Sequence, residues 1–301
     1  MIHHISRLRL EREELTLFVF GDLQYGADGF NLEAWKEFEH EFKTTPNAWA
    51  LGLGDYQDFA RPTMRGRLEA SASHDDSIKK QLDKMVILEQ DKLLNLMGFL
   101  EGRCIGLHEG HHTWNLGSGI KTDQRIASAL KAPFLGWMAS TRLCLAYGKA
   151  KNNDHKRTLI HTIVSMHGNA NARRTGGAAA WLENNIMPGF LADHYIQGHA
   201  CKHVAWEPNE RKEIRREGPA GVIMRIPKCM QVGGFHSGYT DGWQSSYVER
   251  FGFTPQPLGY GVIRFKRIER QGLQELNGTP GKRNKTLLVE QFNRTIGGVN
   301  E

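Results

Sequence analysis

An α/β fold, with two packed mixed β-sheets flanked by helices, is the fold class that the sequence predicts. In the first half of the chain, apolar runs typical of buried strands alternate with amphipathic stretches typical of helices. The second half is richer in short strand-like runs, and no Pro/Ser-rich linker separates the halves. With 301 residues, 40% of them hydrophobic, the chain can bury a sizeable core. We therefore expect a single domain over residues 1–270.

The first half carries a repeated strand, loop and helix pattern. The expected strands are 15–21, 48–53 and 104–107, and the expected helices are 31–42 and 78–100. Asn31 is the expected cap of the first helix, because its side chain can accept a backbone N–H at a helix start. Alternating strands and helices imply crossovers and a largely parallel sheet, which collects ligands at the carboxyl ends of its strands.

The second half predicts mostly strands and ends in a polar segment. The expected strands are 158–165, 194–196, 222–226, 230–233 and 261–267, with a helix near 178–185. From residue 271 to 301 the sequence is polar and rich in Gly and Asn. We expect this C-terminal segment to be a loosely attached appendage.

Charge and segment composition exclude some function classes. The formal net charge of +6 favours an anionic partner, which phosphate-bearing substrates satisfy. No apolar run approaches the roughly 18 residues that a membrane-spanning helix needs, and the N-terminus lacks the features of a secretory signal. The four cysteines form no Cys-x-x-Cys pair, which argues against a disulfide framework. Cytoplasmic residence and no membrane partner are therefore expected.

Five short polar groups each follow a strand-like run and place an Asp or a His beside a glycine. They are Gly21-Asp22-Leu23-Gln24, Gly54-Asp55-Tyr56-Gln57-Asp58, Gly110-His111-His112, Met166-His167-Gly168 and Gly198-His199-Ala200-Cys201. Glycine lets the backbone turn sharply, so that neighbouring side chains reach a common point. Carboxylates and imidazoles are metal ligands, and two divalent ions can activate water for phosphoryl transfer without a nucleophilic side chain.

The order of these groups over residues 15–205 resembles the calcineurin-like metallophosphoesterases. That family has Asp-x-His, then Gly-Asp, then Gly-Asn-His-Asp/Glu, then a lone His, then Gly-His-x-His. The stretch 165–198 looks most like stand-alone members of viral or phage type. The resemblance implies an α/β/β/α sandwich and a dinuclear metal centre.

Two metal pockets bridged by Asp55 follow from the resemblance. The first pocket would consist of Asp22, Gln24, Asp55 and Cys201, and the second of Asp55, His111, His167 and His199. In the family, a metal-bound hydroxide between the ions is the nucleophile. The resemblance gives His112 the role of stabilising the transition state or protonating the leaving oxygen, so His112 and Asp55 are the expected catalytic residues.

The sequence departs from the family pattern at three ligand positions. Gln24 and Cys201 stand where the family has histidines, and His111 stands where it has asparagine. His203 is an alternative to Cys201 as the last ligand. A different alignment, through Gly106-Leu107-His108-Glu109, puts leucine at a ligand position, and leucine cannot bind metal. We expect Mn, Zn or Fe, bound more weakly in the first pocket, where a thiolate would favour zinc or iron.

The expected activity is hydrolysis of a phosphoester, by a phosphodiesterase or nuclease or by a nucleotide phosphatase. Arg173 and Arg174 are the expected substrate contacts, because guanidinium groups hold phosphate through paired hydrogen bonds. Asp58 is a candidate for orienting a ligand imidazole. The aromatic-rich segment 235–247 either stacks a nucleobase or packs the loop. The alternative is a catalytically degenerate relative that binds nucleic acid or protein, which the altered first pocket motivates.

Overall fold

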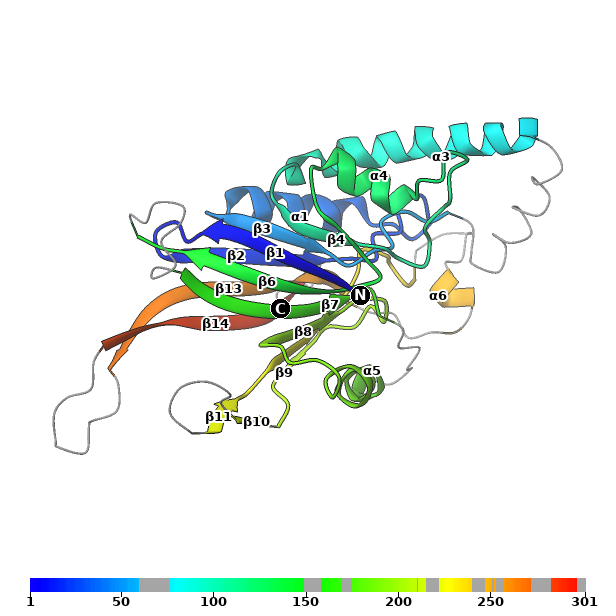
Figure 1. The fold of residues 1–301 in the computed structure, drawn as a ribbon. Helices are drawn as coiled ribbons and strands as arrows, with labels where there is room; N and C mark the ends of the chain where they lie inside the picture. Colours follow the sequence, from blue (N-terminus) through cyan, green and yellow to red (C-terminus); the bar gives the residue numbers. More distant parts are fainter. Residues whose placement is uncertain are drawn as a thin grey trace, which may run out of the picture.

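The predicted α/β class with two packed mixed sheets is confirmed (Figure 1). The computed structural model describes residues 1–59, 76–148, 158–168, 175–209, 211–214, 222–239, 247–250, 252, 257–271 and 283–296. Helices α1, α3 and α4 lie on one side of the two sheets, and α5 lies on the opposite side. The layers are therefore helix, sheet, sheet and helix.

Sheet 1 has six strands in the order β1-β6-β7-β8-β12-β9. These are β1 (Ile2–Arg9), β6 (Met138–Ala146), β7 (Thr158–Met166), β8 (His194–Gln197), β12 (Lys228–Gln231) and β9 (Val204–Trp206). Strands β7, β8 and β12 are parallel neighbours, whereas β6 runs antiparallel to β7. The carboxyl ends of β7 and β8 therefore lie at one edge of sheet 1.

Sheet 2 has six strands in the order β14-β13-β2-β3-β4-β5. These are β14 (Arg283–Ile296), β13 (Leu258–Gln271), β2 (Glu14–Phe20), β3 (Ala48–Gly52), β4 (Cys104–His108) and β5 (Phe134–Gly136). The four strands β2, β3, β4 and β5 are parallel, so their carboxyl ends share one edge. The strands β10 (Arg211–Ile214) and β11 (Val222–Arg225) form a separate antiparallel pair, below both sheets in Figure 1.

The three predicted helices correspond to α1, to α3 with η1 and to α5 with η3, whereas α4 and α6 were not predicted. The helices are α1 (Leu32–Thr44), α3 (Asp76–Met97), the 3₁₀ turn η1 (Gly98–Leu100), α4 (Thr122–Ala129), α5 (Thr175–Trp181), the π-helical turn η3 (Leu182–Ile186) and α6 (Tyr247–Arg250). Asn31 caps α1 as expected, since its Oδ1 accepts the backbone N–H of Ala34 at 2.9 Å. None of the helices in the described ranges is long and apolar enough to cross a membrane.

Three apolar layers hold the sandwich together, and β2 shows how strand periodicity builds two of them. Phe18 and Phe20 pack against α1 in the layer between the helices and sheet 2, beside Phe38. Leu17 and Val19 point the other way, into the layer between the two sheets. This alternation follows from the two-residue repeat of a strand. A third layer, which includes Leu182 and Tyr195, lies between sheet 1 and the α5–η3 segment.

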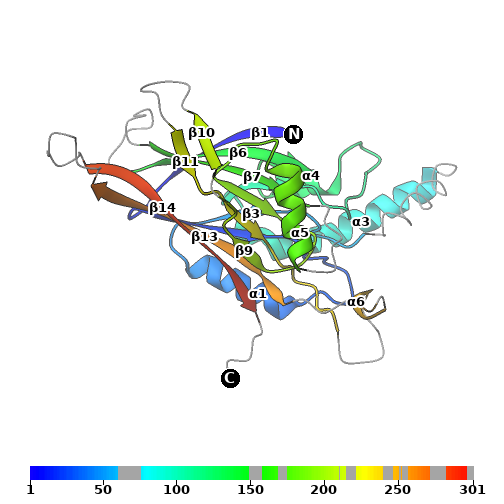
Figure 2. The same cartoon turned by 90° about the horizontal axis from the view of Figure 1, so that it is seen from below.

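The expectation of a loosely attached appendage from residue 271 is wrong for Arg283–Ile296. These residues form β14, which pairs with β13 along fourteen positions, and the two strands run side by side in Figure 2. Ile296 is buried and Phe292 is half-buried against the core. Every second residue of an edge strand faces solvent, so the polar composition reflects an exposed face. The extent of the domain over 1–270 stays a prediction.

Candidate metal centre

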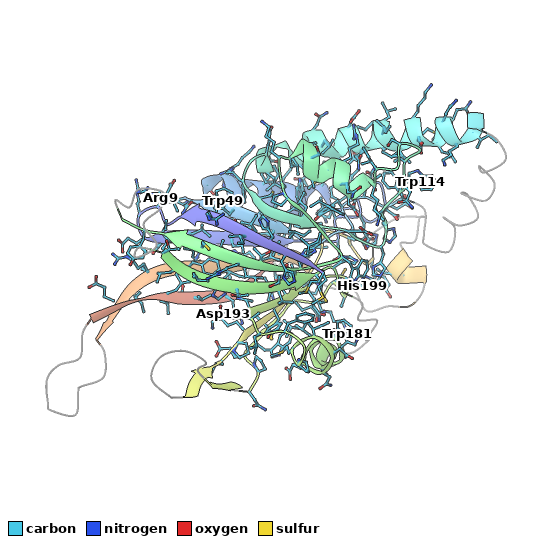
Figure 3. All side chains as sticks on the ribbon, in the orientation of Figure 1. Arg9, Trp49, Trp114, Trp181, Asp193 and His199 are labelled. Atoms are coloured by element: carbon cyan, nitrogen blue, oxygen red, sulfur yellow. The ribbon has the colours of Figure 1, made fainter. Side chains whose placement is uncertain are left out.

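Five predicted ligands follow the ends of five different strands. Asp22 follows β2, Asp55 follows β3 and His111 follows β4, all in sheet 2. His167 directly follows β7, and His199 follows β8, both in sheet 1. Because these strands are parallel within each sheet, their loops emerge at a common end of the sandwich. Figure 3 shows His199 at this end, where the strands of both sheets converge.

The backbone at the centre adopts a conformation that non-glycine residues rarely take. The residues with a left-handed φ here are Asp22 (49°), Gln24 (50°), Asp55 (51°), His199 (63°) and Cys201 (47°). This conformation costs about 1–2 kcal/mol for each residue that carries a Cβ. Such strain gathers where a fold must aim side chains, so its concentration in three of the predicted blocks supports a functional site.

Glycine allows two of the loops to touch. Gly54 has a φ of +98°, and a Cβ on it would lie 2.8 Å from the backbone nitrogen of Gly110. A Cβ on Gly110 would lie 2.1 Å from both the backbone nitrogen and the Oδ1 of Asp55. A side chain at Gly110 would therefore push the His111 loop away from Asp55.

Four of the predicted ligands come together in one group. Within the described part of the chain, a single set of His, Cys, Asp or Glu side chains is close enough to share an ion, namely Asp55, His111, His167 and His199. Their ligand atoms all lie within 4.8 Å of one another. One carboxylate with three imidazoles fits Zn or Fe better than Mg or Ca, which prefer oxygen ligands. The residues predicted for the second pocket are thus adjacent, and ion binding by them stays a prediction.

His167 is fixed in the tautomer that a metal ligand needs. Its Nδ1 lies 2.7 Å from the carbonyl oxygen of Leu53, which can only accept, so Nδ1 carries the hydrogen. The other ring nitrogen, Nε2, faces Asp55 Oδ2 at 3.3 Å. Burial lowers the pKa of His167, but the Asp55 carboxylate outweighs burial and raises it to about 9. At neutral pH a protonated His167 therefore faces the Asp55 carboxylate.

Asp22 has an oxygen available for a cation. Its Oδ2 accepts the backbone N–H of His199 at 2.9 Å, which ties the β2 loop to the β8 loop. Its Oδ1 is buried and makes no hydrogen bond. Burial raises the pKa of Asp22 to about 6, with Asp55 adding repulsion against the opposing effect of His167. A buried carboxylate oxygen without a partner is costly unless an ion satisfies it.

Asp22 and Asp55 affect the pKa of Cys201, whereas burial alone shifts the pKa of the alternative ligand His203. Burial and the adjacent carboxylates of Asp22 and Asp55 raise the pKa of the Cys201 thiol well above its ordinary value. The ring of His203 instead packs on Gly233, where a Cβ would lie 1.7 Å from its Nε2. This geometry favours Cys201 over His203, but neither belongs to the four-residue group.

Gln24 contacts the Asp55 loop through its backbone. Its N–H donates to the carbonyl oxygen of Asp55 at 3.0 Å, so the loops that carry Asp22 and Asp55 are joined directly. Ligation by the Gln24 side chain stays a prediction. The weaker binding expected in the first pocket likewise stays a prediction.

His112 lies beside the cluster with one ring nitrogen on each side. Its Nδ1 is 2.8 Å from Asp58 Oδ1, and its Nε2 is 4.0 Å from Asp55 Oδ2. Its backbone N–H also donates to Asp55 Oδ1 at 3.0 Å. Burial lowers the pKa of His112, but the combined effect of Asp58 and Asp55 is larger and raises it, so the net shift is upward. Asp58 therefore lies where it can orient His112, the catalytic imidazole in our prediction.

His108 and Asp123 support the centre, and the sequence assigned neither of them a role. His108 lies between the two sheets, with Nδ1 2.9 Å from the Gly136 carbonyl oxygen and Nε2 2.8 Å from Ser165 Oγ. Asp123 accepts the backbone N–H of Gly110 at 3.0 Å, which holds the loop before His111. Burial raises the pKa of Asp123 to about 7. Neither side chain shows a distinctive local pattern, because each acts on a residue far away in the chain.

The alternative alignment of the third block does not provide a ligand. Leu107 is fully buried in the core, and His108 is engaged with Gly136 and Ser165 away from the four-residue group. His111, in contrast, is a member of that group. The geometry therefore favours the alignment through His111.

The predicted substrate contacts divide between described and undescribed residues. Arg173 and Arg174 lie outside the described residues, as does Trp243. Phe235 is buried, and its ring centroid lies 5.1 Å from that of Trp35, so it packs the core and offers no stacking surface. Tyr239 is half exposed. Of the two interpretations of the aromatic-rich segment, packing is therefore the correct one for Phe235.

The chain is similar to several solved structures at low identity, while no protein-family model and no curated protein matches it. Vps29 of Cryptosporidium parvum shares 13% identity at a TM-score of 0.38, over 93% of this chain and 99% of its own. Vps29 of Entamoeba histolytica, complexed with zinc, shares 10% identity at a TM-score of 0.36, over 93% of this chain and 99% of its own. The calcineurin-like phosphoesterase YfkN of Bacillus subtilis shares 10% identity at a TM-score of 0.42, over 95% of this chain and 91% of its own. At these values, the functional argument rests on the residues of this chain.

Proposed function

We propose that the protein is a metal-dependent hydrolase of phosphoesters. The observation that carries the proposal is the group of Asp55, His111, His167 and His199, with His112 beside it on an Asp58 partner. A divalent ion held there would supply positive charge for the phosphoryl oxygens and lower the pKa of water. Asp22, with its buried unpaired oxygen, and Cys201 extend the donor set towards a second ion.

In the proposed reaction, His112 acts on the leaving oxygen. Its Nδ1 faces Asp58, so its Nε2 is the atom that faces the cluster and can deliver a proton. Asp58 raises the pKa of His112 and so keeps more of it in the acid form near neutral pH. The buried position of His167 and Asp55 excludes water from the other side of the cluster.

The finer proposal concerns the substrate. The net charge of +6 favours an anionic partner, and we propose a nucleotide or nucleic-acid phosphoester, cut by a phosphodiesterase, nuclease or phosphatase activity. We propose Zn or Fe as the ion, because three of the four grouped donors are imidazoles, and Mn as the alternative, which the carboxylate of Asp55 would suit.

Hydrolysis of bis-p-nitrophenyl phosphate and mono-p-nitrophenyl phosphate, with Mn, Zn or Fe supplied, tests the proposal. We expect turnover by the wild type and a loss of about 100-fold or more in kcat/KM for His167→Ala, which removes a ligand. His40→Ala is the matched control, since His40 is exposed on α1. If the wild type bound metal but hydrolysed neither ester, the proposal of a hydrolase would be wrong, and a binding protein with the same fold would be favoured.

A further inference from the structure

Trp137 is the single residue between β5 and β6, where the chain passes from sheet 2 to sheet 1. Its position is fixed on both sides. The carbonyl oxygen of Gly136 accepts the backbone N–H of Glu109 at 3.0 Å, and the carbonyl oxygen of Trp137 itself accepts the N–H of His167 at 3.2 Å. The loops that carry the proposed ligands therefore hold Trp137 in place.

The indole of Trp137 packs against two histidines of the four-residue group, and part of the indole stays exposed. Its ring centroid lies 4.6 Å from that of His111, with the planes at 88°, and 5.3 Å from that of His167. Even so, the residue is 37% exposed, whereas Trp35 is fully buried. The chain thus keeps a large flat apolar surface open beside the point where a phosphoryl group would bind. Packing against His111 alone would not require that exposure.

We propose that Trp137 is a stacking surface for the nucleobase of the substrate, and this inference rests on the proposed function. A nucleotide joins a flat ring to a phosphate through one sugar, so its phosphate can sit at the cluster while its base covers the adjacent indole. Every base has a π-face, which makes stacking tolerant of base identity. Because Trp137 is held by backbone bonds on both sides, little conformational freedom is lost on binding.

Two substrates with the same leaving group test the stacking. Thymidine 5′-(p-nitrophenyl phosphate) carries a base, and methyl p-nitrophenyl phosphate does not. For Trp137→Leu we expect KM for the thymidine ester to rise about 5- to 150-fold with kcat nearly unchanged, and KM for the methyl ester to stay the same. Trp137→Phe keeps a ring and should retain most of the preference. Trp49→Leu is the control, because Trp49 lies at the other end of the sandwich from His199 (Figure 3).

The outcomes separate this inference from the proposed function. If Trp137→Leu lowered kcat/KM equally for both esters, Trp137 would act through His111, and the stacking proposal would be wrong. Unchanged kinetics on both esters would also overturn it. If the wild type hydrolyses neither ester, the proposed function fails. Calorimetric titration with thymidine monophosphate then tests the stacking by itself. A Kd for thymidine monophosphate at least about 5-fold higher in Trp137→Leu than in the wild type, with an unchanged Kd for inorganic phosphate, supports the stacking. An unchanged Kd overturns it.

Discussion

Asp55 and His167 form a buried ion pair at the centre of the proposed site, 3.3 Å apart. The pair holds the pKa of Asp55 below its ordinary value despite burial, and raises that of His167 to about 9. His199 is in the opposite state, because burial and the neighbouring His167 and His111 lower its pKa to about 3. Near neutral pH His167 is therefore protonated and His199 is neutral.

A metal ion that binds at this cluster must displace the proton of His167. We expect the association constant for Zn or Mn to rise about tenfold per pH unit between pH 6.5 and 8.5, since His167 is protonated below a pKa of about 9. Below the Asp22 pKa of about 6, the slope should steepen if Asp22 also binds the ion. Calorimetry in buffers of different ionisation enthalpy measures the protons released, and a pH-independent affinity would contradict this picture.

Asp58 acts on catalysis through His112, to which it lies at 2.8 Å. In Asp58→Asn the charged imidazole loses its partner, so the pKa of His112 should fall and the alkaline limb of the kcat profile should move to lower pH. We expect kcat at pH 8 to fall about 10- to 100-fold with metal content unchanged. Asp91→Asn, at a surface ion pair with Arg125, is the control. A profile that keeps its shape would assign Asp58 a purely structural role.

We expect Cys201 to make the first pocket the weaker one, because burial and the carboxylates of Asp22 and Asp55 raise the pKa of its thiol. In Cys201→His a neutral imidazole replaces the thiol. We expect elemental mass spectrometry to find about one metal per chain in the wild type and about two in this variant. Cys144→His makes the same change on β6 as a control. Two metals already bound by the wild type would show that Cys201 is a competent ligand.

At the scale of elements, His108 and Ser165 join β4 of sheet 2 to β7 of sheet 1 directly beneath the cluster. Since the Gly136 carbonyl oxygen fixes the hydrogen on Nδ1, His108 Nε2 accepts from the Ser165 hydroxyl. Burial lowers the pKa of His108 to about 4, which keeps the ring neutral. The bond thereby sets the relative position of the two strands that lead to His111 and His167.

Ser165→Ala removes this bond and leaves a buried ring nitrogen unsatisfied. We expect the free energy of unfolding to fall by about 1–3 kcal/mol. Metal affinity should also fall, because the two ligand loops are no longer held in register. Urea unfolding and metal titration measure the two effects. Ser140→Ala, on the neighbouring β6, is the matched control. Unchanged stability would mean that water or another group replaces the hydroxyl.

At the scale of the whole molecule, the proposed ligands connect the two sheets. Asp55 and His111 come from sheet 2, and His167 and His199 from sheet 1, so an ion bound to all four links the layers at one end. Ligands that bind only the folded state stabilise it by mass action. The metal centre should therefore be a global stability element as well as a chemical one.

Saturating metal should raise the melting temperature of the protein. At a metal concentration of 100 times Kd the gain is about 2.7 kcal/mol, which corresponds to about 4 °C for a chain of 301 residues. EDTA should reverse the shift, and His167→Ala should show none, as differential scanning calorimetry can measure. The same shift in His167→Ala as in the wild type would place the stabilising ion elsewhere.

The sequence by itself determined the alternation of elements and the order of the candidate ligands. Strand periodicity, a glycine at the turn and an Asp or His after it are all local features, so β2, β3 and β4 with Asp22, Asp55 and His111 were accessible from short segments. Capping of α1 by Asn31 is equally local. The sequence also marked Cys201 as a departure, because one residue in a repeated motif can be compared position by position.

Tertiary structure alone decided which distant segments meet. Strand β14 has a polar composition and becomes a strand through its ladder with β13, and β1 finds its partner in β6 far along the chain. Trp137 and His108 gain their importance from contacts with His167 and Ser165, which no spacing in the sequence encodes. Side-chain pattern specifies an element locally, whereas pairing and burial depend on surfaces that exist only once the chain has folded.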